Sequence, residues 1–101
     1  MVPCFGHAGD GNVHARLICP PEWSDDRWRD TLPRLLADTY QATAALGGRI
    51  SGEHGIGCKR KAYMRTVVSE EYLHLLRAVK QAFDPNQILN PGKMFPPAEM
   101  A

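Results

Sequence analysis

Two histidines flank a glycine-rich stretch near the start of the chain, in the segment GHAGDGNVH at residues 6–14. The segment predicts a hairpin, because Asp10-Gly11 suits the central positions of a type I′ turn, where both φ angles are positive. A turn centred there makes His7 and His14 direct cross-strand partners, with Cβ atoms roughly 4.5 to 5.5 Å apart. Two imidazoles at that separation can bind one divalent metal ion through bonds of about 2.0 to 2.1 Å. Both histidines also suit surface or hydrogen-bonded strand positions, so the motif alone leaves both interpretations open.

Two further polar side chains are predicted on the strand face that carries His14. Asn12 can hydrogen-bond a substrate or stabilise the turn, since asparagine is favoured beside turns for backbone reasons. Arg16 can bind a substrate carboxylate through two parallel hydrogen bonds, or it can be an ordinary solvated arginine. Both are therefore candidate substrate-binding residues.

A carboxylate and an imidazole are neighbours in the segment SGEHGIG at residues 51–57. The glycines around them let the backbone approach other groups closely. Glu53 is a candidate third metal ligand, and two histidines with one carboxylate and open positions are typical of a catalytic metal site. Side chains of adjacent residues in an extended segment point in opposite directions, so His54 is available as a proton acceptor for a substrate instead. Taken alone, the segment is a weak signal, and a structural loop is the more frequent role of such a sequence.

The elements that must position these residues begin with strand, turn and strand over residues 2–19. In the second arm apolar residues alternate with polar ones, as expected of a half-buried strand whose apolar face meets a core. The apolar members are Val13, Ala15, Leu17 and Cys19. A short third strand is a candidate at residues 49–51.

Two amphipathic helices are predicted after the hairpin. The first follows an N-cap at Ser24 and stops at Gly47-Gly48, with Pro33 kinking it or dividing it in two. The second begins near Ser69 and ends at Asp84-Pro85. The second helix carries one apolar stripe, which comprises Tyr72, Leu75, Leu76, Val79 and Phe83.

The composition is that of one small globular domain covering residues 1–101, with 44% hydrophobic and 23% charged residues. A net charge of +1 gives no reason to expect nucleic acid as a partner. Neither a transmembrane run of about 18 apolar residues nor a signal-peptide pattern is present, so a cytoplasmic location is the default expectation. The three cysteines include no CxxC pair, which favours reduced thiols, and Cys4 and Cys19 are expected in the core.

Three ordered segments together resemble the C-terminal part of the FAD-linked oxidase family: GHAGDGNVH, SGEHGIG and, at residues 84–95, DPNQILNPGKMF. This family of vanillyl-alcohol-oxidase-type flavoproteins includes D-lactate dehydrogenase, glycolate oxidase and D-2-hydroxyglutarate dehydrogenase. The resemblance implies an α+β fold, in which an antiparallel sheet carries helices on one face as the ferredoxin-like half of the substrate domain. It also implies that FAD is bound mainly by a domain that is absent from these residues.

The same resemblance implies roles for individual side chains. His7, His14 and Glu53 would be ligands of a divalent metal, zinc or manganese, and His54 would take the hydroxyl proton while hydride passes to the flavin. Asn90 and Lys93 resemble the family segment that returns toward the flavin, although Asn-Pro-Gly is also ordinary turn chemistry. Arg60 stands where relatives commonly have lysine, which keeps the charge but changes the geometry, and a solvated basic loop is the alternative.

The resemblance implies a fragment or subunit of an enzyme that oxidises a D-2-hydroxy acid to the 2-oxo acid with hydride transfer to flavin. This chain alone is expected to be incomplete and inactive, with an FAD-binding domain or subunit and the hydroxy acid as its partners. Uncovered sheet edges favour pairing with a second chain, so homo-oligomers are expected when it is isolated. The alternative is a stand-alone module that binds a metal and an organic acid without redox activity.

Overall fold

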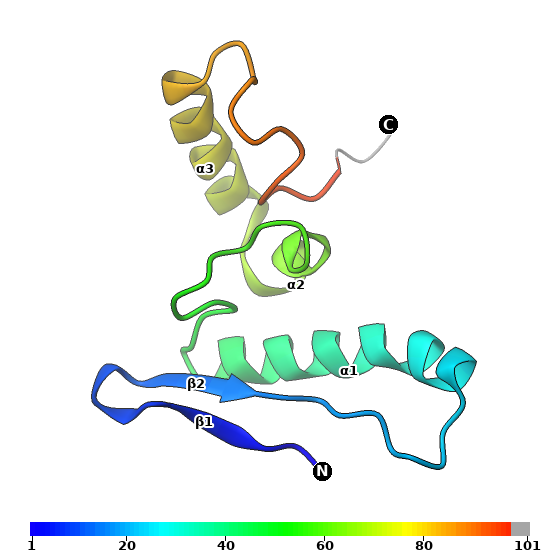
Figure 1. The fold of residues 1–101 in the computed structure, drawn as a ribbon. Helices are drawn as coiled ribbons and strands as arrows, with labels where there is room; N and C mark the ends of the chain where they lie inside the picture. Colours follow the sequence, from blue (N-terminus) through cyan, green and yellow to red (C-terminus); the bar gives the residue numbers. More distant parts are fainter. Residues whose placement is uncertain (98–101) are drawn as a thin grey trace. The chain divides into compact units, whose positions relative to one another are not determined.

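The computed structural model describes residues 1–97, and the chain divides into two compact units, the first covering Met1–Asp38 and the second starting at Thr39. Figure 1 traces the order of the elements along the chain. The first unit contains a hairpin and the start of a long helix, and the second contains the end of that helix, a glycine-rich loop, two further helices and a tail. The predicted α+β class is confirmed, with a two-stranded antiparallel sheet.

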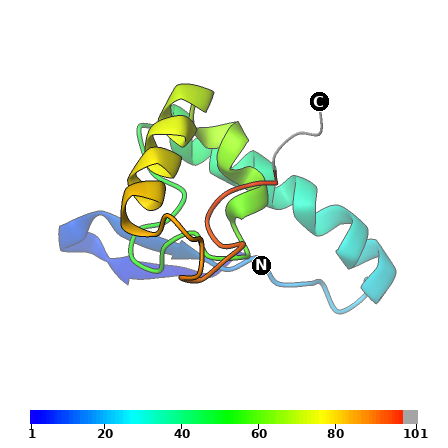
Figure 2. The same ribbon diagram turned by 90° about the horizontal axis from the view of Figure 1, so that it is seen from above.

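The hairpin pairs β1 (Cys4–His7) with β2 (Asn12–Ala15), and the two strands lie side by side in both Figure 1 and Figure 2. The predicted two-residue turn is wrong. A 3-10 turn, η1 (Ala8–Asp10), and Gly11 at φ 68° separate the strands, and the Gly11 N–H donates to the Ala8 carbonyl at 3.2 Å. Ala8 and Gly9, which were expected to lie next to a two-residue turn, are therefore part of a helical turn that ends at the left-handed Gly11.

Helix α1 (Asp25–Ala45) begins as predicted, because the Ser24 hydroxyl accepts a hydrogen bond from the Arg27 N–H at 3.2 Å. Pro33 lies inside α1 without dividing it. The helix ends in a Schellman motif, in which Gly47 has φ 82° and the Gly48 N–H donates to the Thr43 carbonyl at 2.9 Å. The glycine pair therefore stops this helix as its composition predicted.

The second unit continues with η2 (Lys61–Tyr63), α2 (Met64–Val67) and α3 (Glu70–Phe83). The predicted cap of α3 is confirmed, because the Ser69 hydroxyl accepts from the Tyr72 N–H at 3.2 Å. No strand forms at residues 49–51, so that expectation is wrong.

The core of the second unit is small, with Met64 4% and Leu73 0% exposed. The apolar stripe predicted on α3 is largely exposed, and its solvent-facing members are Tyr72 (49%), Leu75 (59%), Val79 (50%) and Phe83 (82%). Leu76 alone of that stripe is partly covered. The spacing of apolar residues correctly predicted an apolar surface on α3. The side of the helix that is buried, however, is the one that carries Leu73, because the described segments cover only that side.

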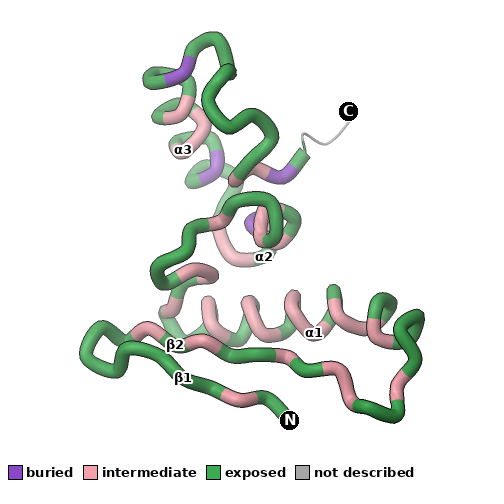
Figure 3. The backbone as a smooth tube through the Cα atoms, viewed as in Figure 1, coloured by how far each residue is buried: buried purple, intermediate pink, exposed green. Residues whose placement is uncertain are grey.

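The first unit has no fully buried residue among its described positions, and Figure 3 shows exposed and half-buried backbone along it. Val13 is 69% exposed, so the expectation that its strand face meets a core is wrong here. Cys4 is exposed and Cys19 is only half-buried, so the prediction that both lie in the core is wrong. The hairpin is therefore held by its backbone ladder rather than by a core of its own.

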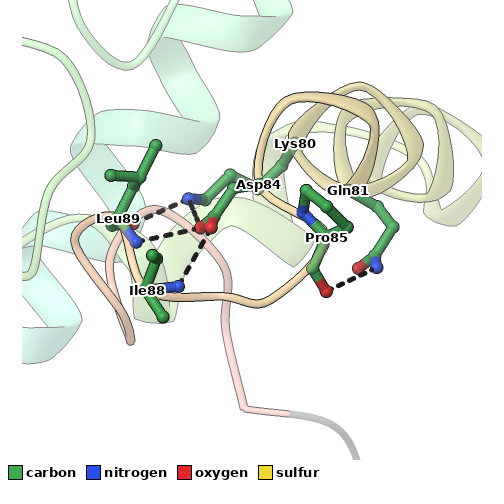
Figure 4. A network of polar contacts seen from close by, with 6 residues as sticks. All are labelled: Lys80, Gln81, Asp84, Pro85, Ile88 and Leu89. Carbon is green, nitrogen blue, oxygen red and sulfur yellow. Dashed lines mark hydrogen bonds and ion pairs between the residues drawn. The ribbon is translucent and has the colours of Figure 1, made fainter.

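A carboxylate fixes the turn that follows α3 (Figure 4). Asp84 is 3% exposed and forms an ion pair with Lys80, while it accepts hydrogen bonds from the N–H groups of Ile88 (2.9 Å) and Leu89 (3.1 Å). Lys80 also donates to the Leu89 carbonyl at 2.7 Å. These bonds determine where the tail leaves the helix.

Candidate functional site

The hairpin places both predicted histidine ligands on one face. His7 pairs with Asn12 and His14 pairs with Phe5, so the predicted direct pairing of the two histidines is wrong. The observed register differs from the predicted one by two residues, and a shift by an even number leaves every side chain on its original face. His7 and His14 are therefore diagonal neighbours across the two strands. Such neighbours are about 7 to 8 Å apart, a separation that long side chains can still bridge.

An aromatic ring accompanies the second histidine. The Phe5 ring stacks on the His14 imidazole, with centroids 5.0 Å apart and planes inclined by 20°. His14 is half-buried, whereas Phe5 is 56% exposed. The stack limits rotation of the imidazole. The sequence interpretation missed this role of Phe5, although its position two residues before His7 places it on the same strand face.

Two candidate substrate residues lie in the same unit. Asn12 is half-buried opposite His7, and the Arg16 N–H donates to the Pro3 carbonyl at 3.0 Å, which continues the strand pairing beyond β2. The exposed Arg16 lines a wide hollow together with two leucines of α1, Leu32 and Leu36. The hairpin therefore offers an amide and a guanidinium near its histidines.

The loop at residues 51–57 brings a carboxylate and an imidazole together. His54 Nε2 lies 3.7 Å from Glu53 Oε1, and their side chains are 67% and 39% exposed. Gly55 (φ 72°) and Gly57 (φ 55°) adopt left-handed conformations, so the loop curves instead of running extended. The expectation that these neighbouring side chains point in opposite directions is therefore wrong, and both can offer ligand or proton-accepting atoms on one side of the loop.

Arg60 stabilises this loop through its side chain and its backbone. Its guanidinium Nη1 donates to the Gly55 carbonyl at 3.2 Å, and its backbone N–H donates to the Ile56 carbonyl at 3.3 Å. The arginine therefore stabilises the curvature that places Glu53 and His54. This contact is a structural role that the sequence interpretation did not assign to the residue.

The tail at residues 90–94 is fastened to the same loop. The Met94 N–H donates to the Gly57 carbonyl at 2.8 Å, and Lys93 Nζ donates to Cys58 Sγ at 2.9 Å. Lys61, which the sequence interpretation did not single out, adds a third bond to the Gly92 carbonyl at 2.7 Å. The two predicted cofactor residues of the tail, Asn90 and Lys93, also line a cavity of about 270 Å³.

The predicted site residues are thus shared between the two units. The first unit holds His7, Asn12, His14 and Arg16, and the second holds Glu53, His54, Arg60, Asn90 and Lys93. Within residues 1–97, no helix combines the length and apolarity that crossing a bilayer requires.

Comparison with known proteins identifies relatives that match about nine tenths of this chain. The family described as FAD linked oxidases, C-terminal domain, matches residues 1–94. The GlcD protein of glycolate oxidase from Bacillus subtilis (strain 168) is 43% identical over 94 residues, which cover 90% of this chain and 19% of the relative. D-lactate dehydrogenase of Anaerostipes hadrus is 38% identical, covering 92% of this chain and 19% of the relative. D-2-hydroxyglutarate dehydrogenase of Xanthomonas citri pv. viticola is 42% identical, covering 90% and 19%.

The chain therefore spans about a fifth of the length of these curated relatives. No solved structure matches it.

Proposed function

We propose that this chain, which belongs to the FAD-linked oxidases through their C-terminal domain, forms part of a flavoenzyme that oxidises a D-2-hydroxy acid. In this enzyme it would be the part that binds the metal and the substrate. The observation that carries the proposal is the hairpin register, which keeps His7 and His14 on one strand face together with Asn12. The names of the relatives, which concern glycolate, D-lactate and D-2-hydroxyglutarate, support a small hydroxy acid as the substrate class.

The donor set fits a divalent metal of the zinc or manganese type. Two imidazoles share one strand face, and a carboxylate adjoins a third imidazole at 3.7 Å in the loop. His7, His14 and Glu53 would hold the ion, because imidazole nitrogens and carboxylate oxygens suit zinc and manganese alike. The bound metal would supply Lewis acidity that favours ionisation of the substrate hydroxyl.

Three side chains then have roles toward the substrate. His54 accepts the hydroxyl proton, which its exposed position permits. Arg16 binds the substrate carboxylate through paired hydrogen bonds, and Asn12 orients the hydroxyl end. A flavin held mainly by a separate domain supplies the hydride acceptor, and Asn90, Lys93 and Arg60 are proposed to lie on the cofactor side.

The partner in this proposal is an FAD-binding domain or subunit. The apolar stripe of α3 and the uncovered face around Val13 support contacts with another polypeptide, because exposed apolar surface of this extent favours association. When the chain is isolated, self-association of these surfaces is the proposed outcome.

The metal site is tested by the metal content of chelator-free protein, measured by inductively coupled plasma mass spectrometry. We expect near-stoichiometric metal in the wild type and its loss in the His7→Ala/His14→Ala double variant. His74→Ala is the matched control, since His74 lies exposed on α3 outside the predicted site. Metal retained by the double variant, or lost equally from the control, would contradict the proposed ligands.

The redox role is tested by adding an FAD-binding domain and following flavin bleaching with D-lactate, glycolate or D-2-hydroxyglutarate. We expect His54→Asn to slow flavin reduction by about 10²- to 10⁴-fold, the usual contribution of a general base. Its metal content should stay unchanged. Equal rates in the two proteins would rule out His54 as the base.

The alternative, a module that binds metal and an organic acid without redox activity, is favoured by one observation. The proposed metal and substrate side chains all lie in this chain. Titration calorimetry with the metal-loaded chain distinguishes the two functions. D-lactate binding without flavin reduction in the reconstituted mixture would support the alternative.

A further inference from the structure

Cys58 forms a close pair with a cationic side chain. The thiol sulfur accepts a hydrogen bond from Lys93 Nζ at 2.9 Å, although the two residues are separated by 35 positions in the sequence. Two neighbouring bonds fasten the same segments together, from the Met94 N–H to the Gly57 carbonyl and from Lys61 Nζ to the Gly92 carbonyl. The pair is therefore held from both sides rather than formed by two freely moving surface side chains.

The charges around the sulfur favour its ionised form. The hydrogen bond from Lys93 lowers the pKa of the Cys58 thiol, and the positive charges of Lys93 and Lys61 act in the same direction. A thiolate, and not a neutral thiol, is the nucleophile in reactions of cysteine. Cys58 is also exposed, so a small reagent can reach it.

The other two cysteines of the chain have different surroundings. Cys4 is exposed, and its Sγ lies 3.5 Å from the Val2 carbonyl. Cys19 is half-buried, and its Sγ lies 3.5 Å from the Pro20 carbonyl. Carbonyl oxygens do not stabilise a thiolate, so the three thiols should differ in reactivity.

We propose that Cys58 and Lys93 form a modification site at which the Cys58 thiolate reacts with peroxides and soft electrophiles. With hydrogen peroxide, the sulfur attacks one oxygen, the O–O bond breaks and an S–O bond forms. Cysteine is oxidised by two electrons to the sulfenic acid, and the departing hydroxide takes up a proton to become water. Lys93 holds the reacting sulfur in its ionised form and is a positioning residue. This inference does not depend on the proposed oxidase function.

The test compares Cys58 with Cys4 inside the same folded chain. Iodoacetamide labelling is followed at each cysteine by peptide mass spectrometry across a pH series, and sulfenic acid formed by hydrogen peroxide is trapped with dimedone. We expect Cys58 to react severalfold faster than Cys4 at neutral pH, with its pH profile displaced to lower pH. In denaturing urea the two rates should converge, because the contact with Lys93 is then lost.

Two lysine variants separate the specific contact from general positive charge. Lys93→Met should slow Cys58 toward the rate of Cys4, while Lys59→Met removes the same charge next to Cys58 in sequence and should have little effect. Circular dichroism checks that both variants are folded. Equal rates at Cys58 and Cys4 in the native wild type would overturn the proposal, as would equal slowing by the two variants. If Lys93→Met does not fold, the wild-type comparison between native and urea conditions still decides the question.

Discussion

The hairpin unit and the helical unit hold their shares of the candidate site by different means. In the hairpin, backbone pairing places His7 and His14, the Phe5 ring stacks on His14, and no described residue of the first unit is fully buried. In the helical unit, which has a small core around Leu73, Lys61 and Lys93 fasten the loop to the tail by side-chain bonds, and Arg60 bonds within the loop. The hairpin should therefore be sensitive to changes in the backbone, and the helical unit to the loss of particular side chains.

The largest effect is expected from Leu73→Ala, which empties the fully buried position of the helical core. The free energy of unfolding should fall by about 2 to 5 kcal/mol, as is usual when a buried leucine is truncated to alanine. Urea unfolding followed by circular dichroism measures the change. Leu75→Ala is the matched control, since Leu75 is 59% exposed on the same helix, and a loss of similar size there would mean that α3 packs through its other side.

The hairpin should break when Gly6 is replaced by alanine. A Cβ at Gly6 would lie 2.0 Å from the Asn12 carbonyl oxygen of the partner strand, so the strands must separate. We expect a cost of about 1 to 3 kcal/mol, typical of an overpacked position. Loss of the nuclear Overhauser contacts between Phe5 and His14 reports it. Gly9→Ala provides the control, because nothing lies within 4 Å of a Cβ there, and it should leave those contacts intact.

Acid should weaken the helical unit through Asp84, with a smaller effect. The hydrogen bond from Lys80 lowers the pKa of this carboxyl, and the N–H groups of Ile88 and Leu89 act in the same direction. Since the folded-state pKa lies below the unfolded value of about 3.9, the stabilisation is complete above that value and disappears as the pH falls through the folded-state pKa. Asp84→Asn should remove this pH dependence of the urea midpoint. Persistence of the acid sensitivity in Asp84→Asn would assign it to other groups.

The smallest effect is expected at the start of α3. Ser69→Ala removes the hydroxyl that accepts the Tyr72 N–H, and such a loss costs about 1 kcal/mol. Ser69→Gly should cost only a few tenths of a kcal/mol, because glycine is itself tolerated at this position. Both values come from urea unfolding. An equal cost for the two variants would show that backbone conformation, and not the hydroxyl bond, determines this end of the helix.

Local chemistry made the helix ends predictable from the sequence. Ser69 caps α3 and Gly47-Gly48 ends α1, because a capping hydroxyl and a left-handed glycine act on residues only a few positions away. Of the two effects predicted for Pro33, a kink or a division of the helix, the division does not occur, because α1 runs through this residue.

The hairpin shows how far local signals extend. The alternation of polar and apolar residues correctly placed His7, Asn12 and His14 on one face, since the side-chain period of a strand is two. The identity of the cross-strand partners depended on the length of the loop, which Asp10-Gly11 predicted incorrectly. Only the structure revealed the helical turn that brings Phe5, and not His7, opposite His14.

The sequence by itself determined the family motifs, the helix ends and the strand faces, because each depends on residues that are neighbours along the chain. Only the tertiary structure decided which side of α3 is buried and which lysine meets Cys58. The buried side of α3 and the partner of Cys58 both depend on how segments that are distant in the sequence meet in space. The spacing of apolar residues along the chain does not contain this information. An amphipathic pattern shows that a helix has an apolar side, whereas the covering of that side depends on what else lies beside it.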